Sequence, residues 1–368
     1  MAPDLVLTEE HAALRASVRG LLERGVDHTV RRDGEVQGFD RTVWEQVCAA
    51  GLTGLEVPTG HGGSGAGPVE SWIVLEETGR ALYEGPYLPV LLSTLALLGS
   101  EDEQACADLL PGLVSGSTVA TLAVAGPEGD WYDHGEVMAS PGEGGWSLQG
   151  ARHFVVHGAN ADLLLVFAQA PRGPSLFAVV ADDPRVEVLA LESLDLTRPL
   201  ATVRLHDAPA RLVGVEGGLV DRVDHLRLRA LAAQAAEQAG GAQWCLATSV
   251  RHAATREQFG RPIGSFQAVA HRCSEMLLQA ELAGAAAQVA AATVVADPVA
   301  FPAAALVAAI TATKAFVWTT AETVQVLGGT GFTWQHDAHL YFRRSRSAAQ
   351  LFGAVDQHAA ALAVLLGA

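Results

Sequence analysis

The sequence predicts a mainly α-helical protein with a central β domain, because the hydrophobic periodicity changes twice along its 368 residues. Residues up to about 115 carry apolar side chains at helical spacing between Gly- and Pro-rich connections. Short β-branched runs, separated by Gly, Pro, Asp and Asn, follow to about residue 213. Helical spacing then returns. We therefore expect an N-terminal helical domain over 1–115, a middle β domain over 116–215 and a C-terminal helical domain over 216–368.

Capping residues mark the first helices. Thr8 precedes two glutamates and a run of apolar residues at helical spacing, so a helix should begin directly after it. Asp40 can cap a second helix, which Gly51 would end. The glycine-rich segment 57–65 lacks the Lys-Ser/Thr pair of a P-loop and follows no clear strand. We interpret this segment as a connection between helices.

The later elements follow from β-branched runs and then from long apolar stretches rich in alanine. The predicted strands are Thr118–Val124, Trp146–Gln149, His153–Val156, Leu163–Ala168, Ser175–Val180 and Ala201–Leu205. The predicted helices are Leu226–Ala254, Phe266–Val295, Ala303–Leu327, Ala338–Leu351 and Val355–Leu366. Gly328 and Gly329 should end the third of these helices.

Charge and composition narrow the class of partner. The chain carries 24 basic and 41 acidic residues, a formal net charge of −17, which disfavours nucleic acid and anionic membrane surfaces. Hydrophobic residues make up 49% and charged residues 18%, as expected for a globular chain with much surface to bury. An anionic ligand would therefore need local arginines.

Cysteine usage and the N-terminal sequence favour a cytoplasmic protein without a metal site. The four cysteines, Cys48, Cys106, Cys245 and Cys273, are scattered, which indicates reduced thiols and no Cys-based zinc site. The 13 histidines show no HExxH spacing. The first residues do not form a signal peptide. We predict no membrane span, because the nearest apolar stretch, 303–317, is interrupted by Lys314.

The segment Thr255–Gln267, TREQFGRPIGSFQ, is the strongest motif of the chain. Arg256 stands at the end of a long predicted helix, where its guanidinium can bind a pyrophosphate through two hydrogen bonds. Phe259 can pack beside an adenine or ribose, and the amide of Gln267 lies near the same ligand as the next helix begins. Alone, Arg256 could cap a helix and Phe259 could be a core residue. The whole string favours a cofactor site, because so many residues untypical of a core coincide.

A second segment, Gln325–Gly329, ends a helix and therefore cannot hold phosphate through the helix dipole, whose C-terminal end repels anions. Its glycines allow close approach of the backbone to a ligand. Alone, this segment would be an ordinary helix end. The following Thr330–Thr333 and the basic run Arg343–Arg346 favour a functional interpretation.

Together these segments resemble the acyl-CoA dehydrogenase family over nearly the full length, and the loop 57–65 and Glu76–Arg80 match it more loosely. The resemblance implies an N-terminal helical domain, a small β-barrel and a C-terminal four-helix bundle. It also implies FAD, an acyl-CoA substrate desaturated between its α and β carbons, and a tetramer. The positions that match the family's contacts to the adenosine and pyrophosphate of a neighbouring subunit's FAD are Arg256, Phe259, Gln267, Gln325, Val326, Leu327, Gly328 and Gly329.

The positions of the family's catalytic base hold no carboxylate in this chain. Many members carry a Glu in a Tyr-Glu-Gly-Thr turn, where this sequence has Phe352. Other members carry the base on the long helix before the TREQFG string, at about Ala230 here. We therefore assign no catalytic residue. Candidate substitute bases are Asp356, Glu322 and Glu237, although each is more typical of a structural or solvated carboxylate.

The β domain also departs from the family pattern. Members usually carry a Thr-Glu-Pro-Gly-Ala-Gly-Ser-Asp-like loop around the flavin, and this region reads Ala123–Asp130 here. The family's Trp-Ile-Thr strand reads Phe154–Val156. Losing these polar groups would leave N5 and the ring carbonyls of a flavin poorly satisfied by hydrogen bonds.

Three hypotheses follow. In the first, the chain is the non-catalytic subunit of a heteromeric, α2β2, steroid-type acyl-CoA dehydrogenase that reduces an acceptor such as an electron-transfer flavoprotein. In the second, it is a self-sufficient homotetrameric dehydrogenase with a displaced base. In the third, it is a flavin-free binding or scaffold protein derived from the family.

Overall fold

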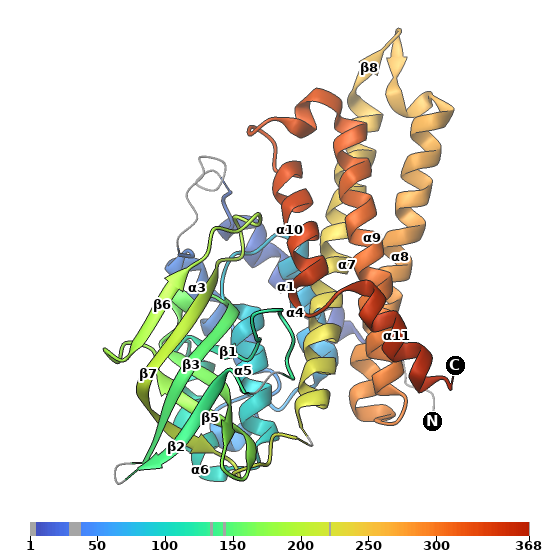
Figure 1. Cartoon of the computed structure of the whole chain (residues 1–368). Coiled ribbons are helices and arrows are strands. Elements are labelled where there is room, and N and C mark those ends of the chain that lie inside the picture. Colours follow the sequence, from blue (N-terminus) through green and yellow to red (C-terminus); the bar gives the residue numbers. More distant parts are fainter. Residues whose placement is uncertain (1–4, 29–37, 133–134, 143–144, 221, 368) are drawn as a thin grey trace.

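The computed structural model describes residues 5–28, 38–132, 135–142, 145–220 and 222–367. An N-terminal helical region, a β-barrel and a bundle of long helices follow one another along the chain (Figure 1). The first region contains α1 (Glu9–Gly25), α3 (Arg41–Ala49), α4 (Pro68–Arg80), α5 (Tyr87–Gly99) and α6 (Glu103–Ser115). The strands are β1 (Ala120–Ala123), β2 (Val137–Gly142), β3 (Gly145–Val156), β4 (Leu163–Ala170), β5 (Gly173–Val180), β6 (Val186–Ala190) and β7 (Leu200–Val213). The last region contains α7 (Val223–Thr255), α8 (Gln267–Ala296), α9 (Phe301–Leu327), α10 (Ala338–Leu351) and α11 (Val355–Leu365).

Both predicted caps of the N-terminal region are confirmed. The Thr8 side chain accepts a hydrogen bond from the backbone N–H of His11, and α1 begins at the next residue. Asp40 accepts from the N–H groups of Thr42 and Val43 at 2.8 and 3.2 Å. The segment 57–65 connects α3 to α4 through the short helix η2 (Thr59–His61) and forms no strand.

The strands close into a small barrel around a hydrophobic core. β5 pairs with both β4 and β7, and the order β4-β2-β3-β7-β5 closes the ring. The prediction of two strands at Trp146–Gln149 and His153–Val156 was wrong, because both belong to the continuous strand β3. β2 and β6 were not predicted. β2 alternates buried and exposed residues before Pro141, and no residue of β6 is fully buried, so neither has the apolar signal of a core strand.

The helical bundle is joined to the N-terminal region by a close contact between α4 and α7. A Cβ atom at Gly79 would lie 1.9 Å from the backbone oxygen of Glu237, and one at Gly240 would lie 1.8 Å from that of Glu76. Only glycine permits this approach. The predicted helices of the bundle are confirmed to within three residues at each end.

Candidate functional site

The TREQFG segment forms an exposed hairpin at one end of the bundle. Arg256 caps the C-terminus of α7, and its carbonyl oxygen accepts a hydrogen bond from the N–H of Ile263 at 2.8 Å. The hairpin consists of β8 (Glu257–Gln258) and β9 (Arg261–Pro262). Phe259 lies in its turn with a φ of 53° and a side chain that is 92% exposed. An aromatic residue with left-handed backbone and almost no burial does not serve the core of its own chain.

The glycine turn is the second predicted part of the site. α9 ends at Leu327, and Gly328 adopts a φ of 61°, which favours glycine. A Cβ added at Gly328 or Gly329 would meet no atom within 4 Å, so the surface above both residues is open to a ligand. Gln325 is exposed, whereas the side chains of Val326 and Leu327 are buried. Those two residues can therefore offer only their backbone to a ligand.

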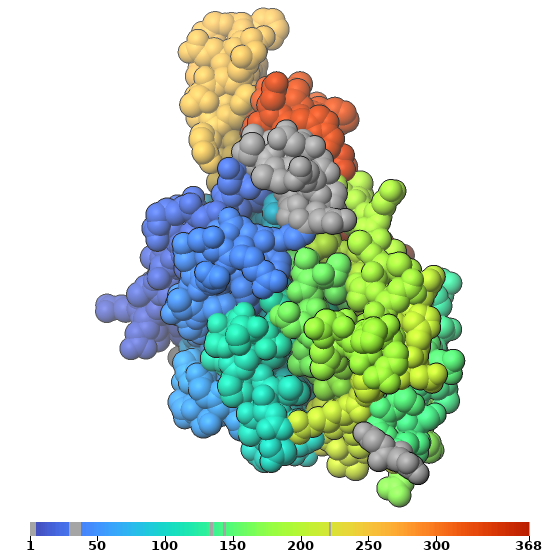
Figure 2. All heavy atoms as spheres, turned by 90° about the vertical axis from the view of Figure 1, so that its left-hand side faces the viewer, coloured from blue at the N-terminus to red at the C-terminus, as the bar shows by residue number. Residues whose placement is uncertain are grey.

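Both segments lie at the same end of the bundle. An ion pair joins Arg272 of α8, five positions after Gln267, to Glu322 of α9, three positions before Gln325. The hairpin end protrudes from the rest of the molecule (Figures 1 and 2). Arg256, Gln267 and the glycine turn are thus exposed together, on a surface that a neighbouring molecule can reach.

The place expected to hold this chain's own flavin is filled by aromatic side chains. Phe352 follows α10 in a turn with Gly353, and its ring centroid lies 5.7 Å from that of buried Trp131 in a T-shaped arrangement. The remaining void measures about 30 Å³, enough for about one water molecule and not for a tricyclic flavin ring. The void is lined by residues of all three regions that the sequence predicted around a flavin: Ala123–Asp130, Phe154–Val156 and Phe352. The void is lined by Leu88, Pro89, Leu92, Thr121, Leu122, Val124, Ala125, Trp131, His153, Phe154, Val156, Leu351 and Phe352.

The alternative base position is also apolar. Ala230 is completely buried within α7. The preceding Arg229 forms an ion pair with Glu56 at 2.5 Å, and the following Leu231 belongs to the hydrophobic core. No carboxylate replaces the family base at either position.

The three substitute-base candidates have other surroundings. Glu237 is buried and paired with Arg198 at 2.5 Å. Glu322 is paired with Arg272, and Asp356 is exposed in the first turn of α11. Each has the environment of a structural or solvated carboxylate, and none lines the void beside Phe352.

The basic run after the glycine turn has a structural member that sequence reasoning missed. Arg344 is 4% exposed, pairs with Asp195 at 2.5 Å and donates to the backbone oxygen of Thr197 at 2.8 Å. These contacts attach the segment between β6 and β7 to α10. Since its partners lie about 150 positions earlier in the chain, the sequence offers no signal for this role.

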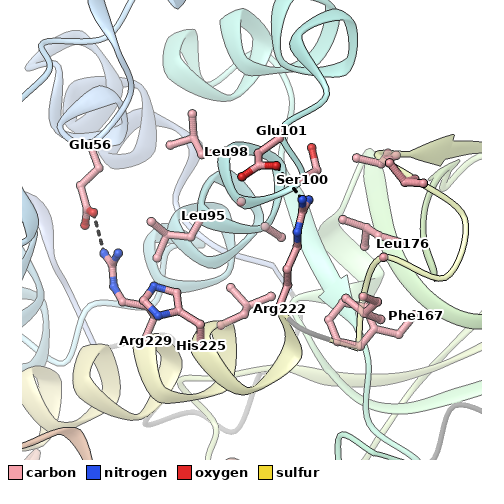
Figure 3. Close-up of a pocket in the computed structure, with 17 residues that line it drawn as sticks. Glu56, Leu95, Leu98, Ser100, Glu101, Phe167, Leu176, Arg222, His225 and Arg229 are labelled. Atoms are coloured by element: carbon pink, nitrogen blue, oxygen red, sulfur yellow. Dashed lines mark hydrogen bonds and ion pairs between the residues drawn. The ribbon is translucent and has the colours of Figure 1, made fainter. Parts of the chain in front are cut away.

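A cavity of about 520 Å³, which the sequence did not indicate, lies between α5, the barrel and the start of α7 (Figure 3). Two ion pairs flank it, Arg222–Glu101 at 2.8 Å and Arg229–Glu56 at 2.5 Å. Partial burial and the neighbouring Arg229 lower the pKa of His225, which lies between the two pairs. The lining comes from positions 56 to 229, so no local motif could reveal it.

Two helical segments, Gln267–Ala296 and Phe301–Phe332, are long and apolar enough to cross a membrane by length and composition alone. The sequence predicted a helix in each of these places and no membrane span. Both pack within the helical bundle, and core helices of globular proteins pass the same test. Within the ranges described above, no cluster of three or more His, Cys, Asp or Glu residues could hold a metal ion.

Known proteins resemble this chain along most of its length. Residues 8–117 match the acyl-CoA dehydrogenase N-terminal domain and residues 227–364 match the C-terminal domain. Acyl-CoA dehydrogenase FadE34 of Mycobacterium tuberculosis is 35% identical over 359 residues, covering 94% of this chain and 46% of FadE34. The chain therefore spans about half the length of that relative. Acyl-CoA dehydrogenase IpdE2 of Mycolicibacterium smegmatis is 32% identical over 352 residues, covering 94% of this chain and 96% of IpdE2.

A solved structure extends the likeness to the complete fold. The crystal structure of the ChsE4-ChsE5 complex from Mycobacterium tuberculosis superposes with a TM-score of 0.90 and 29% identity, covering 99% of both chains. The predicted arrangement of a helical domain, a small barrel and a helical bundle is confirmed. The chain belongs to the acyl-CoA dehydrogenase family of oxidoreductases that act on acyl-CoA thioesters.

Proposed function

We propose that this chain is the non-catalytic subunit of a heteromeric, FAD-dependent acyl-CoA dehydrogenase, in which it completes the FAD site of a catalytic partner. One contrast carries the proposal. The segments that resemble the family's FAD signature are exposed, whereas Phe352 and Trp131 pack together, with a void of about 30 Å³ beside them, where the resemblance would place the chain's own flavin and base. The likeness to the ChsE4-ChsE5 complex supports an assembly of two different subunits.

The exposed end of the bundle offers what the outer half of a bound FAD requires. The guanidinium of Arg256 would bind phosphate oxygens, since its planar fork matches their geometry. The exposed ring of Phe259 would pack against the adenine. The open surface above Gly328 and Gly329 would let the backbone approach the ligand closely, and Gln267 and Gln325 would supply amide groups.

The catalytic partner would carry the chemistry. FAD accepts the hydride that leaves the β carbon of an acyl-CoA, and a carboxylate of the partner would remove the α proton. We extend the proposal to a bulky, steroid-type acyl-CoA as the substrate of the complex. The electron acceptor would be an electron-transfer flavoprotein, and the compartment would be the cytoplasm.

Expression alone and with a partner tests this proposal. The chain is produced by itself and together with the product of the neighbouring gene, and the flavin content and dehydrogenase turnover are measured. We expect colourless protein alone and a flavin-loaded, active complex with the partner. A yellow, active chain alone would establish the self-sufficient homotetramer instead. Colourless, inactive protein in both preparations would favour the flavin-free scaffold.

A matched pair of variants locates the effect. Arg256→Ala in the co-expressed complex should lower its flavin content. Arg251→Ala removes another exposed arginine near the end of α7 and should not change it. Equal loss in both variants would mean that general charge, rather than Arg256, holds the cofactor.

A further inference from the structure

One ion pair connects the two parts of the exposed bundle end, the TREQFG segment and the glycine turn. We propose that Arg272 of α8 and Glu322 of α9 are positioning residues, whose ion pair holds the TREQFG segment in place beside the glycine turn. The inference rests on the proposed function, because the FAD of a catalytic partner is the ligand that would contact both parts.

The segment 254–275, called the projecting span below, is not fixed by the hydrophobic core. The structure describes all of it, and none of its residues is buried. It follows Ala253, which is buried in the last turn of α7, and precedes Met276, the first buried residue of α8. It contains the hairpin and the start of α8, and it protrudes from the molecule (Figures 1 and 2). A segment without buried side chains gains little positional order from packing.

The end of α9 is fixed, in contrast. Thr323 is 1% exposed, and its hydroxyl donates to the backbone oxygen of Cys245 in α7 at 3.2 Å. The same oxygen accepts from the hydroxyl of Ser249 at 3.1 Å. Val326 and Leu327 add buried apolar side chains. The glycine turn therefore begins from a position that the core of the bundle defines.

The Arg272–Glu322 pair joins the projecting span to this fixed helix. Among the described residues, it is the one ion pair or side-chain hydrogen bond between the span and α9. The other polar side-chain contacts of the span stay within it or reach only the adjoining turns of α7 and α8. The side chain of Arg272 is 45% exposed and that of Glu322 is 17% exposed. The guanidinium thus reaches from an exposed helix start to a carboxylate held against the bundle.

The place of the pair suits a positioning role. α8 leads away from the hairpin and α9 returns toward it (Figure 1). Arg272 lies five positions after Gln267, and Glu322 lies three positions before Gln325. At 1.5 Å per residue, these separations are about 7.5 and about 4.5 Å along the two helix axes. A shift of the start of α8 along or away from α9 would therefore change the distance between the two glutamines, and the ion pair opposes such a shift.

A ligand that contacts both parts binds more tightly when they are already held in place. Without the pair, part of the free protein would have the span out of position, and the apparent affinity falls by the fraction that is competent to bind. Partly exposed ion pairs contribute modestly to stability. We therefore expect the dissociation constant of FAD to rise about fivefold when the pair is broken.

Charge alone would give a different pattern. If Arg272 only attracted the phosphates of FAD and Glu322 only repelled them, Arg272→Ala would weaken binding and Glu322→Ala would strengthen it. The two changes would then cancel in the double variant. A positioning pair predicts the same loss in each single variant and no further loss in the double variant, because either substitution breaks the same contact. Alanine favours helix, so neither substitution weakens α8 or α9.

Titration of the flavin-free complex with FAD distinguishes the two patterns. We expect about fivefold weaker binding in Arg272→Ala, in Glu322→Ala and in their combination. The reversed pair, Arg272→Glu combined with Glu322→Arg, should recover most of the affinity. Tighter binding in Glu322→Ala, or wild-type affinity in the double alanine variant, would overturn the proposal. A lower unfolding free energy with unchanged FAD affinity would make the pair structural only and would also overturn it.

Hydrogen–deuterium exchange of the isolated chain tests the pair without FAD. Amides of residues 267–275 should exchange about fivefold faster in either single alanine variant and should regain protection in the reversed pair. Glu281→Ala, which removes an exposed carboxylate of α8 beyond Met276, should leave their exchange unchanged. Wild-type exchange in Arg272→Ala would overturn the proposal. A wild-type complex that takes up no FAD would instead overturn the proposed function, and the exchange comparison would still decide whether the pair holds the span.

Discussion

The end of the bundle that carries Arg256 and Phe259 is exposed, whereas the region around Phe352 is buried and closely packed. At the bundle end, Phe259 is 92% exposed with a left-handed backbone, and Arg256 lies exposed beside it. Around Phe352, the aromatic side chains are buried and in edge contact, with a void of about 30 Å³ between them. The first region costs the isolated chain stability, and the second contributes stability to it.

This difference separates function from folding along one chain. Exposed residues that add little stability to their own subunit are available for a contact outside it. Residues that pack around Phe352 leave no room for a flavin ring beside them and add to the core. Substitutions at the bundle end should therefore change FAD binding by the complex, and substitutions around Phe352 should change the unfolding free energy of the isolated chain. The opposite result in either region would contradict this separation.

The largest effect should come from Trp131→Ala. Its indole is 3% exposed and contacts both Phe167 and Phe352, so truncation leaves a cavity that costs about 4 kcal/mol of unfolding free energy. Denaturant unfolding of the isolated chain measures this loss. The flavin content of the complex, compared at a temperature where the variant is folded, should stay unchanged. Increased flavin binding by the isolated variant would mean that Trp131 alone closes a competent site.

Arg256→Ala should have the converse effect. The substitution removes a guanidinium that would donate two charge-assisted hydrogen bonds to phosphate. The dissociation constant of FAD from the complex should therefore rise about 100-fold, a loss of about 3 kcal/mol of binding free energy. Because the side chain is exposed, the unfolding free energy of the isolated chain should change by less than about 0.5 kcal/mol. Arg256→Lys keeps the positive charge but cannot donate two parallel hydrogen bonds to a phosphate. Its FAD affinity should therefore lie between those of the wild type and Arg256→Ala. A large loss of stability in Arg256→Ala would assign the residue to the fold.

The exposed region has a stronger signal in the sequence than the packing around Phe352, for a physical reason. A ligand-binding surface segment such as TREQFG requires particular residues at particular spacing. Such a pattern can be recognised in the sequence without knowledge of the fold. The burial of Val326 and Leu327 beside exposed Gln325 depends on how α9 packs, which spacing alone did not resolve. The long helices were predicted because their apolar pattern extends over many turns.

The missed features all depend on contacts between distant segments. Trp131 is a single tryptophan in a loop, and only the fold brings it to Phe352. The strand β6 pairs with β7 alone and has no fully buried residue, so its sequence resembles a loop. The cavity beside α5 combines residues from 56 to 229. None of these relations has a local pattern.

Acid should destabilise the filled region through His358. This buried histidine follows the Phe352 turn, and burial together with Arg227 lowers its pKa from 6.5 to about 4. Between pH 6.5 and about 4, His358 is protonated in the unfolded chain and neutral in the folded chain. The free energy of unfolding therefore decreases as the pH falls through this range. We expect about 2 kcal/mol, after allowance for solvent screening. The difference between wild type and His358→Gln over this pH range isolates the effect, and parallel curves would exclude His358 as its source.

The smallest expected changes in stability and FAD affinity are those of Phe259→Gly. Replacing it with glycine removes a non-glycine residue from a left-handed conformation, at the loss of one edge contact with Phe266 at 6.1 Å. The isolated chain should therefore keep its unfolding free energy or gain up to about 1 kcal/mol. The complex should bind FAD about fivefold more weakly, because the ring no longer packs against the ligand.

Phe259→Ala serves as the control, since it removes the same ring but keeps the strained backbone, and it should weaken FAD binding equally without the gain in stability. A residue that lowers affinity while its removal stabilises the chain is retained for a contact outside that chain. If Phe259→Gly instead destabilised the chain and left FAD binding unchanged, the hairpin would belong with the core and the contrast between the two regions would fail at its most exposed point.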